Sequence, residues 1–173
     1  MSAALILPDG HALVGVDEYL RRTEKPNAEY EDGVVYPKAM PTFYHGLLEF
    51  FLVEMLRRAG LVAAAEVSVR LSPTKYLVPD VIAAKSVQLP YPTEPVLLCV
   101  EILSPEDRLG ATLAKCERYH EWGVPFCWVI DPLKGVAWEY PSGGEPARIG
   151  AAGTLRAGEV SIDVAELFAQ LKS

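Results

Sequence analysis

Two carboxylates stand in apolar stretches of the chain, where acidic residues are uncommon. Asp80 follows Pro79 within the stretch 77–84, and Glu101 lies near the end of the stretch 96–103. A buried carboxylate is costly unless it is paired with a cationic group or holds a metal ion. If the two stretches are neighbouring strands of one sheet, both carboxylates can reach one divalent ion. Mg²⁺ takes oxygen ligands and keeps several waters, so two carboxylates are enough to hold it.

The strands that position these carboxylates are predicted from apolar patterns. The stretches 77–84 and 96–103 are almost continuously apolar, which is typical of central strands covered on both faces. Residues 66–71 alternate between apolar and polar types, which predicts a half-buried strand. Further strands are predicted at 125–130 and 136–140, a hairpin at 29–37 around Asp32-Gly33, and a loop or weak hairpin at 141–153.

Helical signals flank the predicted strands. Apolar residues recur at helical spacing over 44–58, and Gly60 provides the stop. Ser104 and Pro105 are typical of an N-cap and a first helical position, which predicts a helix to about Trp122. Shorter helices are predicted at 16–22 and 164–172. Helices and strands in this order predict an α/β (α+β) fold, with a mixed sheet flanked by helices.

The composition is that of a globular protein, and we expect a single domain over residues 1–173. No apolar stretch approaches the ~20 residues that span a bilayer, so no membrane partner is expected. Residues 1–10 lack a basic start, so we expect no signal peptide and a cytoplasmic location. The cysteines are odd in number and widely spaced, and we interpret Cys99, Cys116 and Cys127 as buried thiols in a reducing compartment.

The net charge of −7 limits the classes of nucleic-acid protein that the chain fits. A protein that grips nucleic acid non-specifically is expected to carry a basic face. A metal-dependent nuclease is still compatible with this charge, because the metal and a few lysines or arginines supply positive charge locally. We therefore expect any binding to DNA to be weak or assisted by a partner.

Several short motifs follow one another in a specific order over roughly residues 15–140. They are Glu29 with Asp32-Gly33, His45 at a helix start, residues 67–71, Pro79-Asp80, residues 100–105, Lys115 with Tyr119, residues 123–125 and residues 128–132. In their order and spacing they resemble the Uma-two (Uma2) family, described as "putative restriction endonuclease", a branch of the PD-(D/E)XK nuclease superfamily. The resemblance depends on the order of the motifs, since each one alone is short.

This resemblance implies a restriction-endonuclease-like fold and an endonuclease that hydrolyses DNA with Mg²⁺ or Mn²⁺. Asp80 and Glu101 would hold the ion, with the backbone carbonyl of Ile102 as a further oxygen ligand. Such an ion lowers the pKa of a bound water and neutralises charge on the scissile phosphate. Further implied site residues are Glu29, which would complete the metal ligands, and His45 and Tyr119, which would lie behind them. Because cutting both strands of a duplex usually takes two active sites, the resemblance also implies a homodimer.

The chain departs from the superfamily pattern at one position. Leu103 stands two residues after Glu101, where the superfamily has a lysine. The resemblance implies that Lys115, on the following helix, supplies the missing ammonium from a different position in the chain. Arg118, one turn further along that helix, is a rival for this role.

Ordinary structural interpretations stay open for all these residues. Asp80 is compatible with a strand-end aspartate, Glu101 with a helix N-cap or an arginine partner, Lys115 with a solvated lysine, Glu29 with a turn acid, His45 with a local hydrogen bond, and Tyr119 with a core residue. Two other functions are therefore considered beside the nuclease. One is a catalytically silent nuclease-fold protein that acts as a binding or regulatory module. The other is a small-molecule enzyme, which is disfavoured because the chain has no glycine-rich phosphate loop and no nucleophile elbow.

Overall fold

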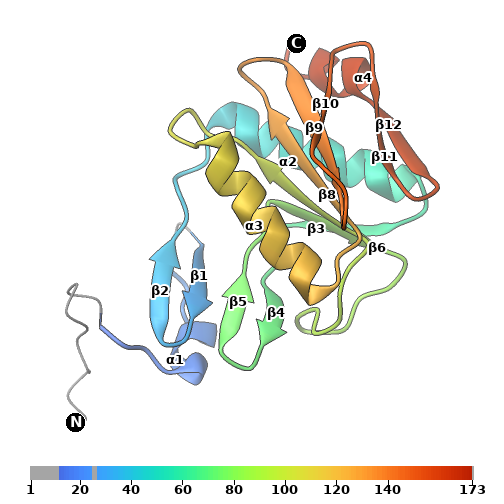
Figure 1. The fold of residues 1–173 in the computed structure, drawn as a ribbon. Coiled ribbons are helices and arrows are strands. Elements are labelled where there is room, and N and C mark those ends of the chain that lie inside the picture. The colour runs from blue at the N-terminus through green and yellow to red at the C-terminus, as the bar shows by residue number, and fades with distance from the viewer. Residues whose placement is uncertain (1–11, 25–26, 173) are drawn as a thin grey trace.

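The computed structural model describes residues 12–24 and 27–172 (Figure 1). The segment 1–10, for which we expect no signal peptide, lies outside the described residues. The helices are α1 (Val16–Leu20), α2 (Phe43–Arg58), α3 (Leu109–Trp122) and α4 (Val164–Ala169). The strands are β1 (Ala28–Glu31), β2 (Val34–Pro37), β3 (Val62–Ala65), β4 (Val69–Ser72), β5 (Lys75–Leu77), β6 (Val81–Ala84), β7 (Leu98–Ile102), β8 (Phe126–Asp131), β9 (Val136–Pro141), β10 (Ala147–Ile149), β11 (Thr154–Ala157) and β12 (Val160–Asp163). Within the described ranges, no helix is long and apolar enough to cross a membrane.

The larger sheet has six strands in the order β10-β9-β8-β7-β6-β3. β7 and β8 are parallel, and the other neighbouring pairs of this sheet are antiparallel. A parallel pair needs a crossover connection, and α3 supplies it by crossing the sheet between β7 and β8 (Figure 1). The mixed sheet flanked by helices that the sequence predicts is therefore confirmed.

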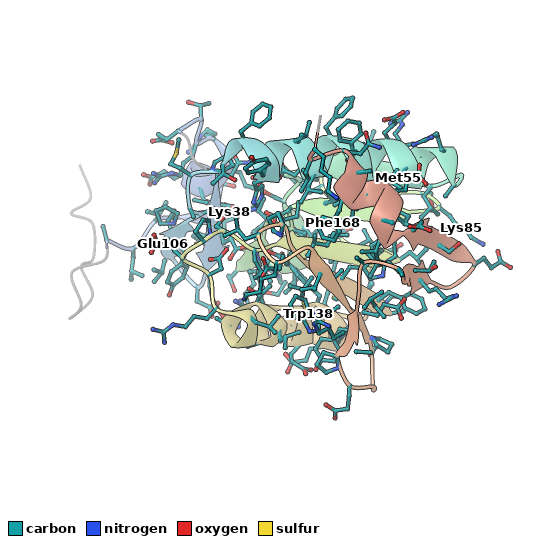
Figure 2. All side chains as sticks on the ribbon, turned by 90° about the horizontal axis from the view of Figure 1, so that it is seen from above. Lys38, Met55, Lys85, Glu106, Trp138 and Phe168 are labelled. Carbon is teal, nitrogen blue, oxygen red and sulfur yellow. The ribbon has the colours of Figure 1, made fainter. Side chains whose placement is uncertain are left out.

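The helices α2 and α3 cover opposite faces of this sheet, as the view from above shows (Figure 2). On the α2 face, Leu48 and Leu52 pack in one apolar cluster with Trp128 of β8 and with residues of α4. On the α3 face, a second cluster contains Cys116 and Tyr119 of α3. The same cluster includes Cys99 and Cys127, so the three cysteines are buried free thiols, as predicted. Both faces of the central strands are thus dry, which explains their continuous apolar sequences.

A smaller antiparallel sheet, in the order β2-β1-β5-β4, leads into the larger one. Its hairpin turn is the predicted one, because Asp32 and Gly33 both have positive φ angles, 48° and 98°. Tyr19 of α1 stacks on Tyr30 of β1, with ring centroids 4.9 Å apart, and Tyr76 of β5 completes this small core. β5 continues through residues 78–80 directly into β6, so the chain passes from one sheet to the other at Asp80.

The predicted strand over residues 66–71 is wrong at its start. β3 ends at Ala65, Glu66 has a positive φ of 56°, and β4 begins only at Val69. A non-glycine residue in this conformation needs support from its surroundings. The Glu66 carboxylate receives hydrogen bonds from Asn27 at 2.6 Å and Lys38 at 2.7 Å, and these partners lie far away in sequence. The alternating pattern could not reveal this tertiary constraint.

The predicted helix start at Ser104 and Pro105 is also wrong, because α3 begins at Leu109. The backbone N–H of Ser104 donates to the Asp107 carboxylate at 2.7 Å, and the Asp107 N–H donates to the Ser104 carbonyl at 3.0 Å. These reciprocal bonds close a turn before the helix, with Arg108 as the extended N-cap residue. The sequence also gave no indication of the β11–β12 hairpin, and β10 lies within the predicted loop 141–153.

Candidate active site

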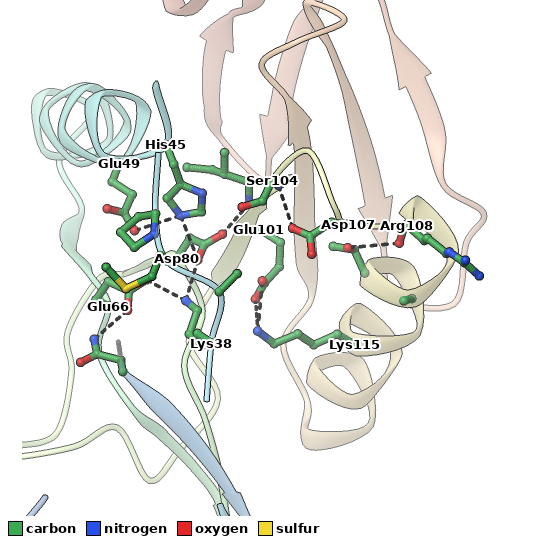
Figure 3. Close-up of a pocket in the computed structure, with 17 residues that line it drawn as sticks. Lys38, His45, Glu49, Glu66, Asp80, Glu101, Ser104, Asp107, Arg108 and Lys115 are labelled. Atoms are coloured by element: carbon green, nitrogen blue, oxygen red, sulfur yellow. Dashed lines mark hydrogen bonds and ion pairs between the residues drawn. The ribbon is translucent and has the colours of Figure 1, made fainter. Parts of the chain in front are cut away.

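The register of β6 and β7 brings the two predicted carboxylates together. These strands are antiparallel, with Val81 opposite Val100, so the next pair in the same register is Asp80 and Glu101. Asp80 is 2% exposed and Glu101 is 6% exposed. The two side chains lie at the strand ends, between α2 and α3 (Figure 3). The sequence-based expectation that both acids stand at the ends of adjacent central strands is therefore confirmed.

Asp80 is surrounded by donors. Its Oδ1 atom lies 2.6 Å from Lys38 Nζ and 3.3 Å from His45 Nε2, and its Oδ2 atom accepts a hydrogen bond from the Ile102 backbone N–H at 2.6 Å. Burial acts to raise the pKa of Asp80, but the His45 hydrogen bond and the positive charges of Lys38 and His45 outweigh it. The pKa of Asp80 is therefore held well below its usual range, and the residue is a carboxylate at neutral pH.

Glu101 has a different environment, because β7 turns its side chain toward α3. Lys115 Nζ lies 3.0 Å from both carboxylate oxygens, and the Tyr119 hydroxyl donates to Oε1 at 2.6 Å. Burial raises the pKa of Glu101 to about 7; the charge of Asp80 adds to this shift, and the charge of Lys115 opposes it. Of the two neighbouring acids, Glu101 is thus the one that exchanges a proton near neutral pH.

Lys115 connects Glu101 to Glu29 of β1. Its Nζ atom lies 2.7 Å from Glu29 Oε1 and 3.4 Å from the Val78 carbonyl oxygen, and Glu29 also accepts a hydrogen bond from the Val78 N–H at 3.0 Å. Burial works against the ammonium, but the charges of Glu101 and Glu29 outweigh it and raise the pKa of Lys115. The rival Arg118 points elsewhere and pairs with Glu31 at 2.9 Å.

Lys38 is a site residue that sequence reasoning missed. It follows β2 directly, and its Nζ atom bridges Asp80 at 2.6 Å, Glu66 at 2.7 Å and the Val78 carbonyl oxygen at 3.0 Å. Burial disfavours its charge, but Asp80 and Glu101 outweigh this effect and raise the pKa of Lys38. No motif marks a lysine after a hairpin as functional, so only the contacts reveal it.

A histidine and two further acids complete the site on the α2 side. Thr42 caps α2 by accepting a hydrogen bond from the His45 N–H at 3.2 Å, and the His45 ring lies 3.4 Å from Glu49 on the next turn. Burial opposes the charged ring, but Asp80 and Glu49 together raise the pKa of His45 to about 10. The four-residue spacing from His45 to Glu49 is a helical signal that could have identified Glu49.

These residues line a cavity of about 550 Å³. The segment after β2, the first turns of α2 and the first turns of α3 form part of its wall, so the cavity lies at the ends of β6 and β7 between α2 and α3 (Figure 3). Two buried acids with opposite pKa shifts and two ammonium groups in one cavity make it the candidate functional site.

Comparisons with known proteins show the family to which the chain belongs. The Uma2 family model, described as "Putative restriction endonuclease", matches residues 16–162. The chain belongs to this family. A crystal structure of a "putative nuclease belonging to DUF820" from Anabaena variabilis superposes on the chain with a TM-score of 0.76 at 20% identity, covering 91% of this chain and 99% of that one. A DrdV–DNA complex, studied by cryo-electron microscopy, is a partial match with a TM-score of 0.42 at 19% identity, covering 59% of this chain and 65% of the other. No curated protein matches the chain.

The departure of this Uma2 protein from the superfamily pattern has a clear structural basis. Leu103 is 6% exposed and packs in the apolar cluster on the α3 face, so a lysine there would have to enter the core. Lys115 reaches the Glu101 carboxylate from α3 instead. The ammonium that the strand lacks is therefore present beside the acid pair, donated by a helix.

The donor atoms also fit the divalent cation that the family implies. Asp80 and Glu101 are buried acids, and ammonium groups of Lys38 and Lys115 now compensate their charge. In an extended strand the N–H and C=O of one residue point to the same side. Because the Ile102 N–H points at Asp80, its carbonyl oxygen faces the same edge of the strand, and Ile102 lines the cavity. Two carboxylates and a carbonyl oxygen are ligands that Mg²⁺ and Mn²⁺ accept.

Proposed function

We propose that this protein is a metal-dependent endonuclease that hydrolyses phosphodiester bonds in DNA. Asp80, Glu101 and the backbone carbonyl of Ile102 are the proposed ligands of Mg²⁺ or Mn²⁺. The observation that carries the proposal is the meeting of two buried carboxylates at the ends of β6 and β7, with a lysine of α3 on one of them. The description of the Uma2 family as restriction endonucleases supports the same reaction.

In this proposal the ion supplies a bound water of lowered pKa and neutralises charge on the phosphate. Lys115 acts as a charged donor to the attacking water or the phosphate oxygens. It does not act as a base, because its pKa is raised and it keeps its proton at neutral pH. Glu29 holds the Lys115 ammonium in place, and the Tyr119 hydroxyl fixes the orientation of the Glu101 carboxylate.

The substrate must approach an acidic protein, since the net charge is −7. Lys38, Lys115 and Arg108 line the cavity, but Lys38 and Lys115 are paired with acids, so positive charge for a phosphate group would come from Arg108 and the proposed ion. This number of cations is small for a protein that holds a long duplex, where affinity follows the number of phosphate contacts. We therefore propose weak or partner-assisted DNA binding, and a homodimer when both strands of a duplex are cut.

Nuclease assays with matched variants test the proposal. Asp80→Asn removes the charge but keeps an oxygen that accepts from the Ile102 N–H. Glu101→Gln removes the charge of the second acid but keeps an oxygen that accepts from the Tyr119 hydroxyl. Both should abolish cleavage of plasmid and linear DNA with Mn²⁺ and weaken Mn²⁺ binding in calorimetry. Glu54→Gln is the control, because Glu54 is a 47% exposed acid on α2 that pairs with Arg58. Mn²⁺ binding without cleavage in the wild type would instead favour the silent binding module.

A further inference from the structure

The outer face of α2 and the segment before it carry large apolar side chains in contact with solvent. Phe43 is 80% exposed, Phe50 is 63% exposed, and Met40, just before the helix, is 70% exposed. Figure 2 shows α2 along one edge of the molecule, with side chains that project outward from it. A surface patch of this kind, rich in aromatic residues and methionine, is typical of an interface with another protein.

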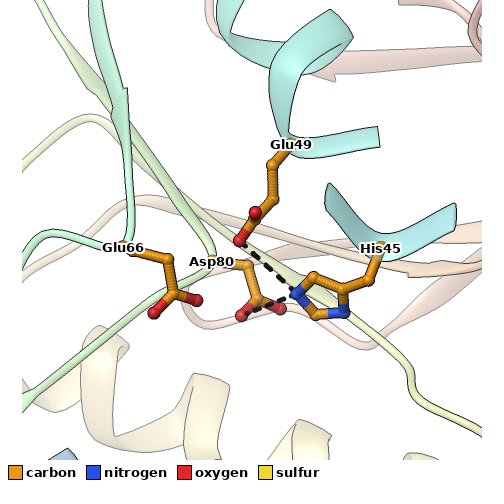
Figure 4. Close-up of side chains that lie close together, drawn as sticks. All are labelled: His45, Glu49, Glu66 and Asp80. Atoms are coloured by element: carbon orange, nitrogen blue, oxygen red, sulfur yellow. Dashed lines mark ion pairs between the residues drawn. The ribbon is translucent and has the colours of Figure 1, made fainter. Parts of the chain in front are cut away.

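The two phenylalanines lie on one face of the helix, and no charge separates them. They are seven residues apart, which is close to two full turns, and Gly46 and Leu47 lie on the same face between them. The one acid in this stretch, Glu49, turns inward, to within 3.4 Å of the buried His45 ring (Figure 4). We call this uncharged surface the α2 strip, and it consists of Phe43, Gly46, Leu47 and Phe50.

The rings of the α2 strip are held in place by their neighbours in the chain. The Phe50 ring centroid lies 5.2 Å from that of Phe51, which packs against the core, and the Phe43 centroid lies 6.3 Å from that of Tyr44. Side chains that are already ordered lose less conformational entropy when a partner binds. Between the rings there is a gap, because a methyl group at Gly46 would have nothing within 4 Å.

The order of residues in the α2 strip is symmetric about its centre. Two residues separate Phe43 from Gly46, and two residues separate Leu47 from Phe50. In an antiparallel pair of α2 helices, with a twofold axis between Gly46 and Leu47, the Leu47 side chain fills the gap at the partner's Gly46. The same axis places Phe43 against the partner's Phe50. A twofold dimer requires this kind of self-complementary surface.

We propose that the α2 strip is the interface of a homodimer, in which the α2 helices of two copies pack antiparallel. The homodimer belongs to the proposed function, on which this inference rests, and the α2 strip supplies its surface. Burial of Met40, Phe43 and Phe50 in both copies removes on the order of 1,000 Å² from water, which is near the lower limit for a stable interface. We therefore expect a weak dimer. DNA fits the strip less well, because the strip has no cation for a phosphate.

The proposed axis also brings the two candidate active sites near each other. It passes within two residues of His45, whose side chain points into the cavity on the opposite side of α2 from the strip. Packed helices have axes about 8–10 Å apart, and side chains extend about 5–6 Å from each axis, so the two His45 rings would be roughly 20 Å apart. This separation is short enough for both sites to act on one duplex.

Sedimentation velocity over about 1–200 µM protein tests the interface, since a surface of the smallest stable size binds weakly. The wild type should shift from the 18.9 kDa monomer to the dimer within this range. Phe50→Ser should weaken association at least about tenfold, because an aromatic contact is lost twice in each dimer. Leu133→Ser is the matched control, because Leu133 is a 66% exposed apolar residue in the β8–β9 turn, and it should associate like the wild type.

A disulfide cross-link tests the antiparallel arrangement. The three native cysteines are buried, whereas Gly46 is exposed, so Gly46→Cys adds one accessible thiol. The two copies of residue 46 flank the proposed axis, and a disulfide needs Cα atoms within about 7 Å of each other. Oxidation should therefore link Gly46→Cys into a covalent dimer and leave Leu133→Cys monomeric under denaturing electrophoresis. Equal cross-linking of the two variants overturns the arrangement.

The remaining outcomes separate this inference from the proposed function. A wild type that stays monomeric, or a Phe50→Ser variant that associates like the wild type, overturns the inference. Weaker DNA binding by Phe50→Ser with unchanged association overturns it too, and assigns the strip to DNA. Should Phe50→Ser fail to fold by circular dichroism, the Gly46→Cys cross-link decides. A wild type that dimerises through the strip but binds no Mn²⁺ in calorimetry supports the interface while the proposed nuclease site fails.

Discussion

Replacement of Lys115 by methionine is the perturbation that tests the site most directly. Methionine keeps an unbranched stem in the wall of the cavity but removes the ammonium. That ammonium is 3.0 Å from both oxygens of Glu101 and 2.7 Å from Glu29, and the Lys115 side chain is 17% exposed. Under the proposed mechanism, loss of one such charged donor slows cleavage by about 10²–10³.

The same substitution should change the free energy of unfolding in a way that depends on pH. Removing one partner of a buried ion pair costs ~3–5 kcal/mol when the other partner must stay charged. Glu101 avoids part of this cost by taking up a proton, since its native pKa is already about 7, against 4.5 for an ordinary glutamate. A raised native pKa makes the folded state bind a proton that the unfolded chain has released, so stability falls as pH rises from 4.5 to 7.

In Lys115→Met the native pKa of Glu101 rises further, and this fall in stability continues above pH 7. Relative to wild type, the loss should therefore be smaller at pH 6 than at pH 8.5, and it should grow by up to ~1.4 kcal/mol per pH unit above 7. Urea unfolding of both proteins at the two pH values measures the difference. Cleavage of plasmid and linear duplex with Mn²⁺ measures the rate.

Arg118→Met is the matched control on the same helix. Arg118 pairs with Glu31 at 2.9 Å and is 34% exposed, so its loss should cost less than ~1 kcal/mol, without the pH dependence, and should leave cleavage intact. Equal cleavage by Lys115→Met and wild type would reject the role of the α3 lysine. Equal loss of stability at pH 6 and pH 8.5 would show that Lys115 does not control the proton on Glu101.

Two further predictions concern the groups that hold the site. Tyr119→Phe removes a fully buried hydroxyl that donates to Glu101 at 2.6 Å, and it should cost about 1.5–3 kcal/mol in urea unfolding at pH 8; an unchanged midpoint would contradict the importance of this bond. Replacing a glycine by alanine should change the melting temperature in opposite directions at Gly46, inside α2, and at Gly123, the C-cap of α3. Gly46→Ala, inside α2 with open space around the new methyl group, should stabilise by about 1 kcal/mol. Gly123→Ala should destabilise, because φ is +114° and the new Cβ would lie 2.9 Å from Pro95; stabilisation by both changes would refute this account.

Much of the scaffold of the site follows from local sequence signals. The continuously apolar stretches around Val81 and Val100 predicted central strands, because a strand buried on both faces needs apolar residues on both. Asp32-Gly33 predicted its hairpin, because both residues adopt positive φ angles at little cost. A carboxylate in such a strand is expensive wherever the strand is placed, so Asp80 and Glu101 were recognisable as candidate site residues before their partners were known.

Element ends were predicted less well, because side chains distant in sequence decide them. Glu66 leaves the strand pattern to reach Asn27 and Lys38, and no feature of residues 66–71 records those partners. Asp107 and Ser104 close a turn where their neighbours alone favoured a helix start. In both cases a hydrogen bond to a particular partner outweighed a weak local preference.

The sequence by itself determined the order of the elements and identified the two acids whose negative charge must be compensated. It could do so because burial and backbone preference depend on the type of each residue. Only the tertiary structure decided which cations compensate them. Lys38 and Lys115 are 77 positions apart in the chain, yet both donate to the carbonyl oxygen of Val78. Long flexible side chains reach several ångströms in any direction, so their partners depend on which elements the fold brings together. The opposite pKa shifts of Asp80 and Glu101 arise from that choice of neighbours, and no local pattern encodes it.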